Sequence, residues 1–129
     1  MPYAVDLYAN GVYIVRVSIL QTVVELPEFL RRAKAIMSDD ERIALVDYIA
    51  ANPGAGLSLG GGLRKIRIAR EDGGKSGGYR TIYVFGGTHI PIFLLTVFAK
   101  NEKGNLTRSE QAAAVAASKM LLASYGDKK

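Results

Sequence analysis

The sequence predicts an α+β fold, in which a small antiparallel sheet is preceded by two helices and followed by a third. Residues 27–52 contain two adjoining amphipathic stretches, each with a helix-start signal. Strand candidates follow at residues 63–69, 79–85 and 89–99, and the glycine-containing connections between them favour an antiparallel meander. An alanine-rich C-terminal helix is expected over residues 109–125.

The first residues are expected to form a separate hairpin. Two alternating apolar runs in residues 1–18 flank an Asn-Gly pair at positions 10–11, which favours the positive φ angles of a tight turn. The stretch ILQTVVEL then predicts a strand, which ends at Pro27. A chain of 129 residues has the length of one domain. We therefore expect an extension at 1–18, one domain at 19–125 and a tail at 126–129.

Both helices before the sheet have recognisable ends in the sequence. The first is expected to begin at Pro27, which suits the first turn of a helix, and to run to Met37. The second follows a capping-box pattern, Ser38 with Glu41, and is expected to end before Pro53. Its apolar stripe is expected at Ile43, Val46 and Ile49 or Ala50.

The remaining segments are predicted from turn and capping signals. The glycine-rich residues 52–62 show no periodicity and are expected to form a loop. Strand 89–99 is apolar on both faces, which favours a central place in the sheet, and it begins at His89, whose expected role is structural. Thr107 with Glu110 forms a second capping-box pattern before the C-terminal helix.

Composition limits the classes of function. A net charge of +5 and a pI near 9.6 indicate an acidic partner: nucleic acid first, an acidic protein second and an anionic membrane third. The absence of cysteine excludes disulfides and a thiolate nucleophile, and a single histidine argues against a histidine metal cluster. The longest apolar run is too short for a membrane helix, and no secretion signal is evident. We expect a cytoplasmic protein with no cofactor, metal or membrane partner.

Cationic side chains gather on the predicted middle strands. Alternation in LRKIRIAR places Lys65 and Arg67 on one face and Ile66 and Ile68 on the other. Arg80 lies on the next strand. Further cations of the same hairpin are Arg64, Arg70 and Lys75. A solvated strand face whose cations discourage edge pairing is the alternative explanation, and the further cations of the hairpin weigh against it. A focused positive field, by contrast, suits a phosphate backbone.

Aromatic residues beside these cations offer rings on which a base could stack. Tyr83 is the strongest candidate, because it shares a face with Thr81 and opposes the apolar residues of its strand. The same alternation places Arg80 on the opposite face from Tyr83. A bulge after Gly78 would re-aim Arg80, and the sequence leaves this question open.

Three segments resemble the motif blocks of a known family: GGLRKIRIA, GKSGGYRTIYVF and LLTVFAKNEKGNLT. Their order and spacing are similar to those of the RelE/HigB-type toxins of bacterial toxin–antitoxin pairs, and of the HigB-like branch in particular. The resemblance covers about residues 20–122 and leaves 1–18 as an extension. It implies the RelE-like fold, a small antiparallel sheet with two N-terminal helices.

The resemblance also implies an activity, namely ribosome-dependent cleavage of messenger RNA at the A-site codon without a metal ion. In that family the 2'-hydroxyl attacks the adjacent phosphate and leaves a 2',3'-cyclic phosphate and a 5'-hydroxyl end. Matching motif to motif, the catalytic residues implied are Lys65, Arg67, Arg80 and Lys100. The RNA-binding residues expected beside them are Arg64, Arg70, Lys75, Tyr83 and Asn101.

The chain departs from the RelE branch in two places. Asn101 stands where that branch has an arginine, and Thr107 falls near the position of a catalytic tyrosine. The acid–base roles therefore have to be argued from chemistry. Arg80 suits the phosphate oxygens, because its planar fork matches them. Lys65, crowded by cations that favour loss of its proton, is a candidate base, and Lys100 is a candidate acid for the leaving 5'-oxygen.

Two other functions fit the same sequence features. ParE-like toxins share the fold and inhibit DNA gyrase by binding it, and a non-catalytic RNA-binding module would use the charge alone. The resemblance further implies a cognate antitoxin, of the helix-turn-helix type. The implied partners are this antitoxin, the ribosome with its mRNA and, through the antitoxin, operator DNA.

Overall fold

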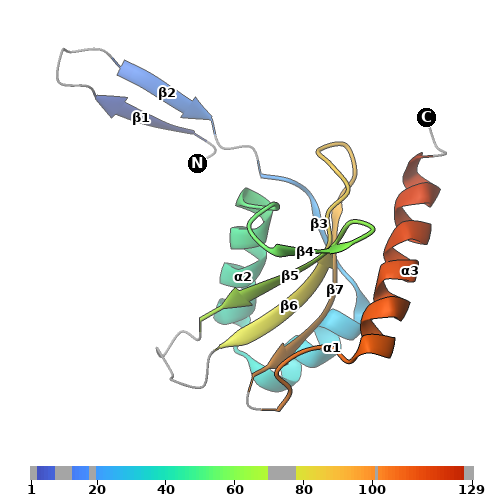
Figure 1. The fold of residues 1–129 in the computed structure, drawn as a ribbon. Coiled ribbons are helices and arrows are strands. Elements are labelled where there is room, and N and C mark those ends of the chain that lie inside the picture. The colour runs from blue at the N-terminus through green and yellow to red at the C-terminus, as the bar shows by residue number, and fades with distance from the viewer. Residues whose placement is uncertain (1–2, 8–12, 18–19, 70–77, 101, 127–129) are drawn as a thin grey trace.

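A computed structural model of the chain describes residues 3–7, 13–17, 20–69, 78–100 and 102–126 (Figure 1). The elements in chain order are β1 (Tyr3–Leu7), β2 (Tyr13–Val17), β3 (Val23–Glu25), α1 (Pro27–Ile36), α2 (Asp39–Ala51), β4 (Leu57–Gly60), β5 (Leu63–Ile68), β6 (Tyr79–Val84), β7 (Ile92–Ala99) and α3 (Arg108–Gly126). The predicted α+β class is confirmed. In the described residues, no helix combines the length and apolar character needed to cross a bilayer.

The main sheet has the strand order β3-β7-β6-β5-β4. Strands β4 to β7 pair antiparallel, so the predicted meander is confirmed, and β7 lies inside the sheet between β3 and β6. One edge differs from the expectation, because β3 pairs parallel with β7. A parallel pair needs a long crossover between its strands, and the chain from α1 through β6 supplies it.

The two faces of the sheet carry separate cores. Helices α1 and α2 cover one face, where Phe29, Leu45 and Ile49 pack against Tyr83 and Leu94. Helix α3 packs on the other face (Figure 1). The buried sheet residues of that second cluster are Leu63, Ile82, Val84, Phe93 and Phe98. Any functional side chain on the α3 face must therefore lie where α3 leaves the sheet uncovered.

The capping signals of α1 and α2 act as the sequence predicts. Pro27 is the first residue of α1. The backbone N–H of Glu41 donates to the Ser38 hydroxyl at 3.1 Å, and the Ser38 N–H donates to the Glu41 carboxylate at 3.0 Å. The predicted stripe of α2 was partly wrong, because Ile43 is 49% exposed and Leu45 is buried in its place. Ile49 lies one turn after Leu45, so this pair sets the inward face.

The glycine-rich segment before β5 was wrongly expected to be a loop throughout. Residues 57–60 form β4, which pairs antiparallel with β5 at the edge of the sheet. Three consecutive glycines with positive φ, Gly60 to Gly62, make the turn between the two strands. The Ser118 hydroxyl of α3 donates to the Gly61 carbonyl at 2.7 Å and ties this turn to the helix.

The strand predicted over residues 89–99 begins three residues later than expected. Strand β7 begins at Ile92, because Pro91 has no N–H to donate to the ladder, and His89 lies in an exposed turn before it.

Strands β1 and β2 pair antiparallel, as the N-terminal hairpin requires, and Figure 1 shows them extending away from the sheet. The Asn-Gly turn predicted at positions 10–11 lies outside the described residues.

Candidate functional site

The register of β5 and β6 brings three cations onto one face. Arg67 lies directly opposite Arg80, and Lys65 lies opposite Ile82. Directly opposed residues of an antiparallel pair point to the same side of a sheet. Since Ile82 packs in the α3-side core, Lys65, Arg67 and Arg80 share that side. The position of Arg80, which the sequence left open, thus needs no bulge after Gly78.

These three cations line one open cavity of about 360 Å³ at the edge of β5. The residues around it are Tyr48, Ala55, Gly56, Leu57, Lys65, Ile66, Arg67 and Arg80. The pairing of β4 with β5 ends at Leu57 opposite Lys65, so β4 does not cover residues 66–68. Because β4 ends there, it leaves the edge of β5 uncovered beside the cations.

Arg80 has the most unusual environment of the three. Partial burial, and after it the positive charge of Arg67, lowers the pKa of Arg80 below its ordinary value. An arginine stays protonated even so. Two guanidinium groups are therefore held as neighbours, and an anion between them would relieve their repulsion. Planar forks of this kind match phosphate oxygens.

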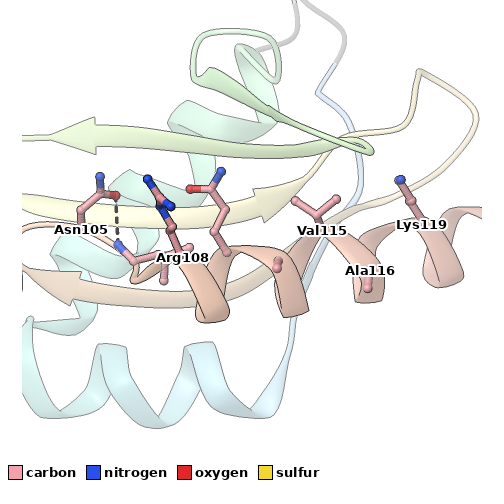
Figure 2. Close-up of a pocket in the computed structure, with 8 residues that line it drawn as sticks. Asn105, Arg108, Val115, Ala116 and Lys119 are labelled. Carbon is pink, nitrogen blue, oxygen red and sulfur yellow. Dashed lines mark hydrogen bonds between the residues drawn. The ribbon is translucent and has the colours of Figure 1, made fainter.

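Lys65 is oriented by a residue that the sequence analysis did not select. Its Nζ donates to the Asn105 Oδ1 at 3.1 Å. The same oxygen accepts the backbone N–H of Leu106 at 2.9 Å, as Figure 2 shows. Asn105 lies 40 positions from Lys65 in the chain. Its only sequence signal is its place in the third motif block, two residues before the cap of α3.

Lys100 follows the last residue of β7 and is exposed. Its backbone N–H donates to the Gly78 carbonyl at 3.2 Å, and Phe98 lies opposite Arg80 in the β6–β7 pair. Lys100 therefore lies at the same end of the sheet as Arg80. It does not line the cavity of the other three cations.

Arg64 supports the wall of this cavity. One guanidinium nitrogen donates to the Gly54 carbonyl at 3.0 Å and to the Gly56 carbonyl. These bonds hold the segment between α2 and β4, and Gly56 lines the cavity. Arg64 thus acts as a tether for the loop, and its expected contact with RNA stays a prediction.

Tyr83 is not available as a stacking platform, contrary to the expectation from its sequence neighbours. The side chain is 0% exposed in the core under α1 and α2. Its hydroxyl donates to the Pro53 carbonyl at 2.8 Å and accepts the Gly56 N–H at 3.1 Å. Tyr83 does lie on the face of the sheet that the alternation predicts, but α1 and α2 cover that face. The expected RNA contacts Arg70, Lys75 and Asn101 lie outside the described residues.

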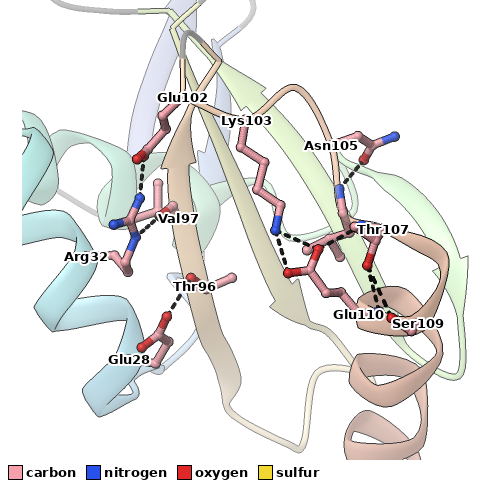
Figure 3. Close-up of polar contacts among 11 residues, drawn as sticks. Glu28, Arg32, Thr96, Val97, Glu102, Lys103, Asn105, Thr107, Ser109 and Glu110 are labelled. Carbon is pink, nitrogen blue, oxygen red and sulfur yellow. Dashed lines mark hydrogen bonds and ion pairs between the residues drawn. The ribbon is translucent and has the colours of Figure 1, made fainter.

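A pair of ionic contacts holds the segment between β7 and α3 (Figure 3). Arg32 of α1 binds the Glu102 carboxylate, which also accepts the Ala99 N–H at 3.0 Å. The hydrogen bond from Arg32 is the main cause, and that from Ala99 the second, of a lowered pKa of Glu102. The ion pair between Arg32 and Glu102 therefore attaches the turn after Lys100 to helix α1.

The other end of this segment is held by the start of α3. The predicted second capping box is present: Glu110 N–H donates to the Thr107 hydroxyl at 3.1 Å, and Thr107 N–H donates to the Glu110 carboxylate at 2.8 Å. Lys103 Nζ binds the same carboxylate at 2.5 Å and is the main cause of a lowered pKa of Glu110 (Figure 3). Asn105 thus lies in a segment fixed at both ends.

In the described part of the chain, no group of three histidine, aspartate or glutamate side chains is arranged to hold a metal ion. The site is defined by three cations on paired strands, an open cavity of about 360 Å³ and one amide that binds Lys65.

Comparison with protein families gives a match over most of the chain. The family model described as the RelE toxin of the RelE / RelB toxin-antitoxin system matches residues 24–128. The matched part contains the three cations, Asn105 and all three helices. It starts after β1 and β2. This chain therefore belongs to the RelE toxin family of toxin–antitoxin systems.

Proposed function

We propose that this protein is a cytoplasmic toxin of the HigB-like branch that cleaves messenger RNA in the ribosomal A site. A cognate antitoxin of the helix-turn-helix type would hold it inactive and connect it to operator DNA. Membership of the RelE family supports the toxin role and the antitoxin partner. The cation cluster supports the proposed reaction on RNA.

The observation that carries this proposal is the cavity shared by Lys65, Arg67 and Arg80. In the proposed reaction the 2'-oxygen forms a bond to phosphorus while the bond from phosphorus to the 5'-oxygen breaks. The 2'-hydroxyl gives its proton to a base, and the 5'-oxygen receives one from an acid. Negative charge grows on the free phosphate oxygens, so cations fixed in place stabilise the transition state more than the ground state.

Each cation has a role that its position supports. Arg80 and Arg67, as opposed neighbours, bind the two free oxygens of the phosphate. Lys65 is the candidate base, because the Asn105 oxygen holds its Nζ in one direction beside the cavity. Lys100 is the candidate acid from the end of β7.

Primer extension on a message translated by purified ribosomes tests the reaction. The wild-type chain is expected to cut within the A-site codon and to leave a 2',3'-cyclic phosphate. Arg80→Ala is expected to lower the cleavage rate by about 100-fold or more, since it removes a donor to the developing charge. Lys34→Ala, on the exposed side of α1, is the matched control and should cleave like the wild type.

Two outcomes would support the competing functions, and a third would contradict the proposed mechanism. Inhibited gyrase with intact message would support the ParE-like alternative. Salt-dependent RNA binding without cut ends would support a non-catalytic module. Equal cleavage by Arg80→Ala and the wild type would remove the cation cluster from the mechanism.

A further inference from the structure

A second groove lies beside the cation cluster, along α3. Its volume is about 610 Å³, and Figure 2 shows Asn105, Arg108, Val115 and Lys119 along one side of the helix. The residues that line it are Asn105, Leu106, Arg108, Gln111, Ala112, Val115, Ala116 and Lys119. We call this set the α3 groove.

The α3 groove begins at the candidate active site. Asn105, at one end, accepts the hydrogen bond of Lys65. Lys119, at the other end, lies over the turn between β4 and β5, where a methyl group added to Gly61 would come within 2.9 Å of its side chain. Arg108 and Lys119 are eleven residues apart, which is about 16 Å along a helix. The groove can therefore take several linked nucleotides that continue from the cation cluster.

The charge of the α3 groove favours a polyanion. Arg108 and Lys119 line it, and its described lining contains no carboxylate. The groove on the other side of α3, of about 460 Å³, carries Glu28 and Glu110 as well as cations, and Lys103 there is paired with Glu110. Helix α3 thus separates a cationic groove from one whose charges are balanced.

The position of Arg108 is also unfavourable for the stability of α3. It is the first residue of α3, where the helix dipole is positive and a cation is unfavourable. Glu110 in the same turn has the stabilising charge and forms the capping box. Helix stability therefore does not account for an exposed arginine at this position.

We propose that the α3 groove binds the single-stranded RNA segment adjoining the cleaved bond, with backbone phosphates at Arg108 and Lys119. The Asn105 Nδ2 can donate a hydrogen bond, and the Gln111 amide can donate and accept, so both can contact base edges or 2'-hydroxyls. This inference rests on the proposed function for the identity of the polyanion. It assigns α3 a role in the affinity and length preference for RNA that is separate from cleavage.

The test is the salt dependence of RNA binding by the full chain. In an Arg80→Ala background, chosen because the variant is expected to slow cleavage, a labelled dodecamer and a labelled dinucleotide are titrated at several salt concentrations. The added pair Arg108→Ala and Lys119→Ala is expected to reduce the slope of log K against log salt by about 1.4 for the dodecamer, roughly 0.7 per phosphate contact. Dinucleotide binding, confined to the cation cluster, should not change.

Lys34→Ala in the same background is the matched control, because it removes one exposed cation from the opposite helical layer. Thermal melting checks that the exposed groove substitutions leave the fold intact. A dodecamer slope that is the same with and without the two groove cations would overturn the proposal. Weaker binding to the antitoxin with unchanged RNA binding would also overturn it, since the groove would then be a protein interface.

Failure of this inference and failure of the proposed function give different results. If the chain cuts message but the dodecamer slope is unchanged, only the groove assignment fails. If the slope falls as expected but no cut ends appear, the groove assignment is supported and the nuclease assignment fails.

Discussion

Single side chains at the candidate site divide into those that line the cavity and those that support its wall. Lys65, Arg67 and Arg80 line the cavity. Arg64 and Tyr83 hold the loop before β4 by hydrogen bonds to its backbone. Their effect on function is therefore expected to come through stability and loop position.

Tyr83→Phe tests this at the residue scale. The change leaves the Pro53 carbonyl and the Gly56 N–H without their buried partner. It should lower the free energy of unfolding by about 1–3 kcal/mol, measured by chemical denaturation. A substituted protein with unchanged stability would show that water replaces the hydroxyl.

Thr81→Val provides a contrast on the same strand. Thr81 is 0% exposed, and its hydroxyl has no hydrogen-bond partner among the described residues. A buried hydroxyl without a partner costs about 1–3 kcal/mol, so replacing it with a methyl group should raise the melting temperature. A lower melting temperature would indicate a partner for this hydroxyl.

At the scale of elements, the segment from Lys100 to α3 depends on charge pairs. Arg32 lowers the pKa of Glu102, and Lys103 lowers that of Glu110. The segment carries Asn105, which orients Lys65. Its position is therefore expected to be sensitive to acid.

Glu102→Gln tests this sensitivity. A carboxyl whose pKa is lowered by folding stabilises the fold above its unfolded pKa of about 4.3, and the gain disappears as the pH falls through the folded pKa. The wild type should therefore melt higher than Glu102→Gln at neutral pH, and the difference should shrink below about pH 4. In an Arg32→Gln background the pH-dependent part should largely disappear, and its persistence would assign it to another group.

At the scale of the whole molecule, the hairpin of β1 and β2 stands apart from the sheet in Figure 1. The family match starts at residue 24, after both strands. The division into an extension at 1–18 and a domain at 19–125 is still a prediction.

Deletion of residues 1–18 tests this division. The shortened chain is expected to keep the melting temperature of the full chain within about 2 °C, because both helical layers and the whole main sheet remain. Differential scanning calorimetry measures it. A fall of many degrees would mean that the hairpin belongs to the folded core.

Local signals in the sequence determined the helix starts, the meander and the shared face of Lys65 and Arg67. Capping boxes and alternation depend on residues two to four positions apart, so they can be read along the chain. Only the tertiary structure decided that Arg80 faces Arg67, that Tyr83 is buried, that residues 57–60 form an edge strand and that Asn105 binds Lys65. Each of these depends on strand register or on packing between distant segments, which local periodicity does not encode.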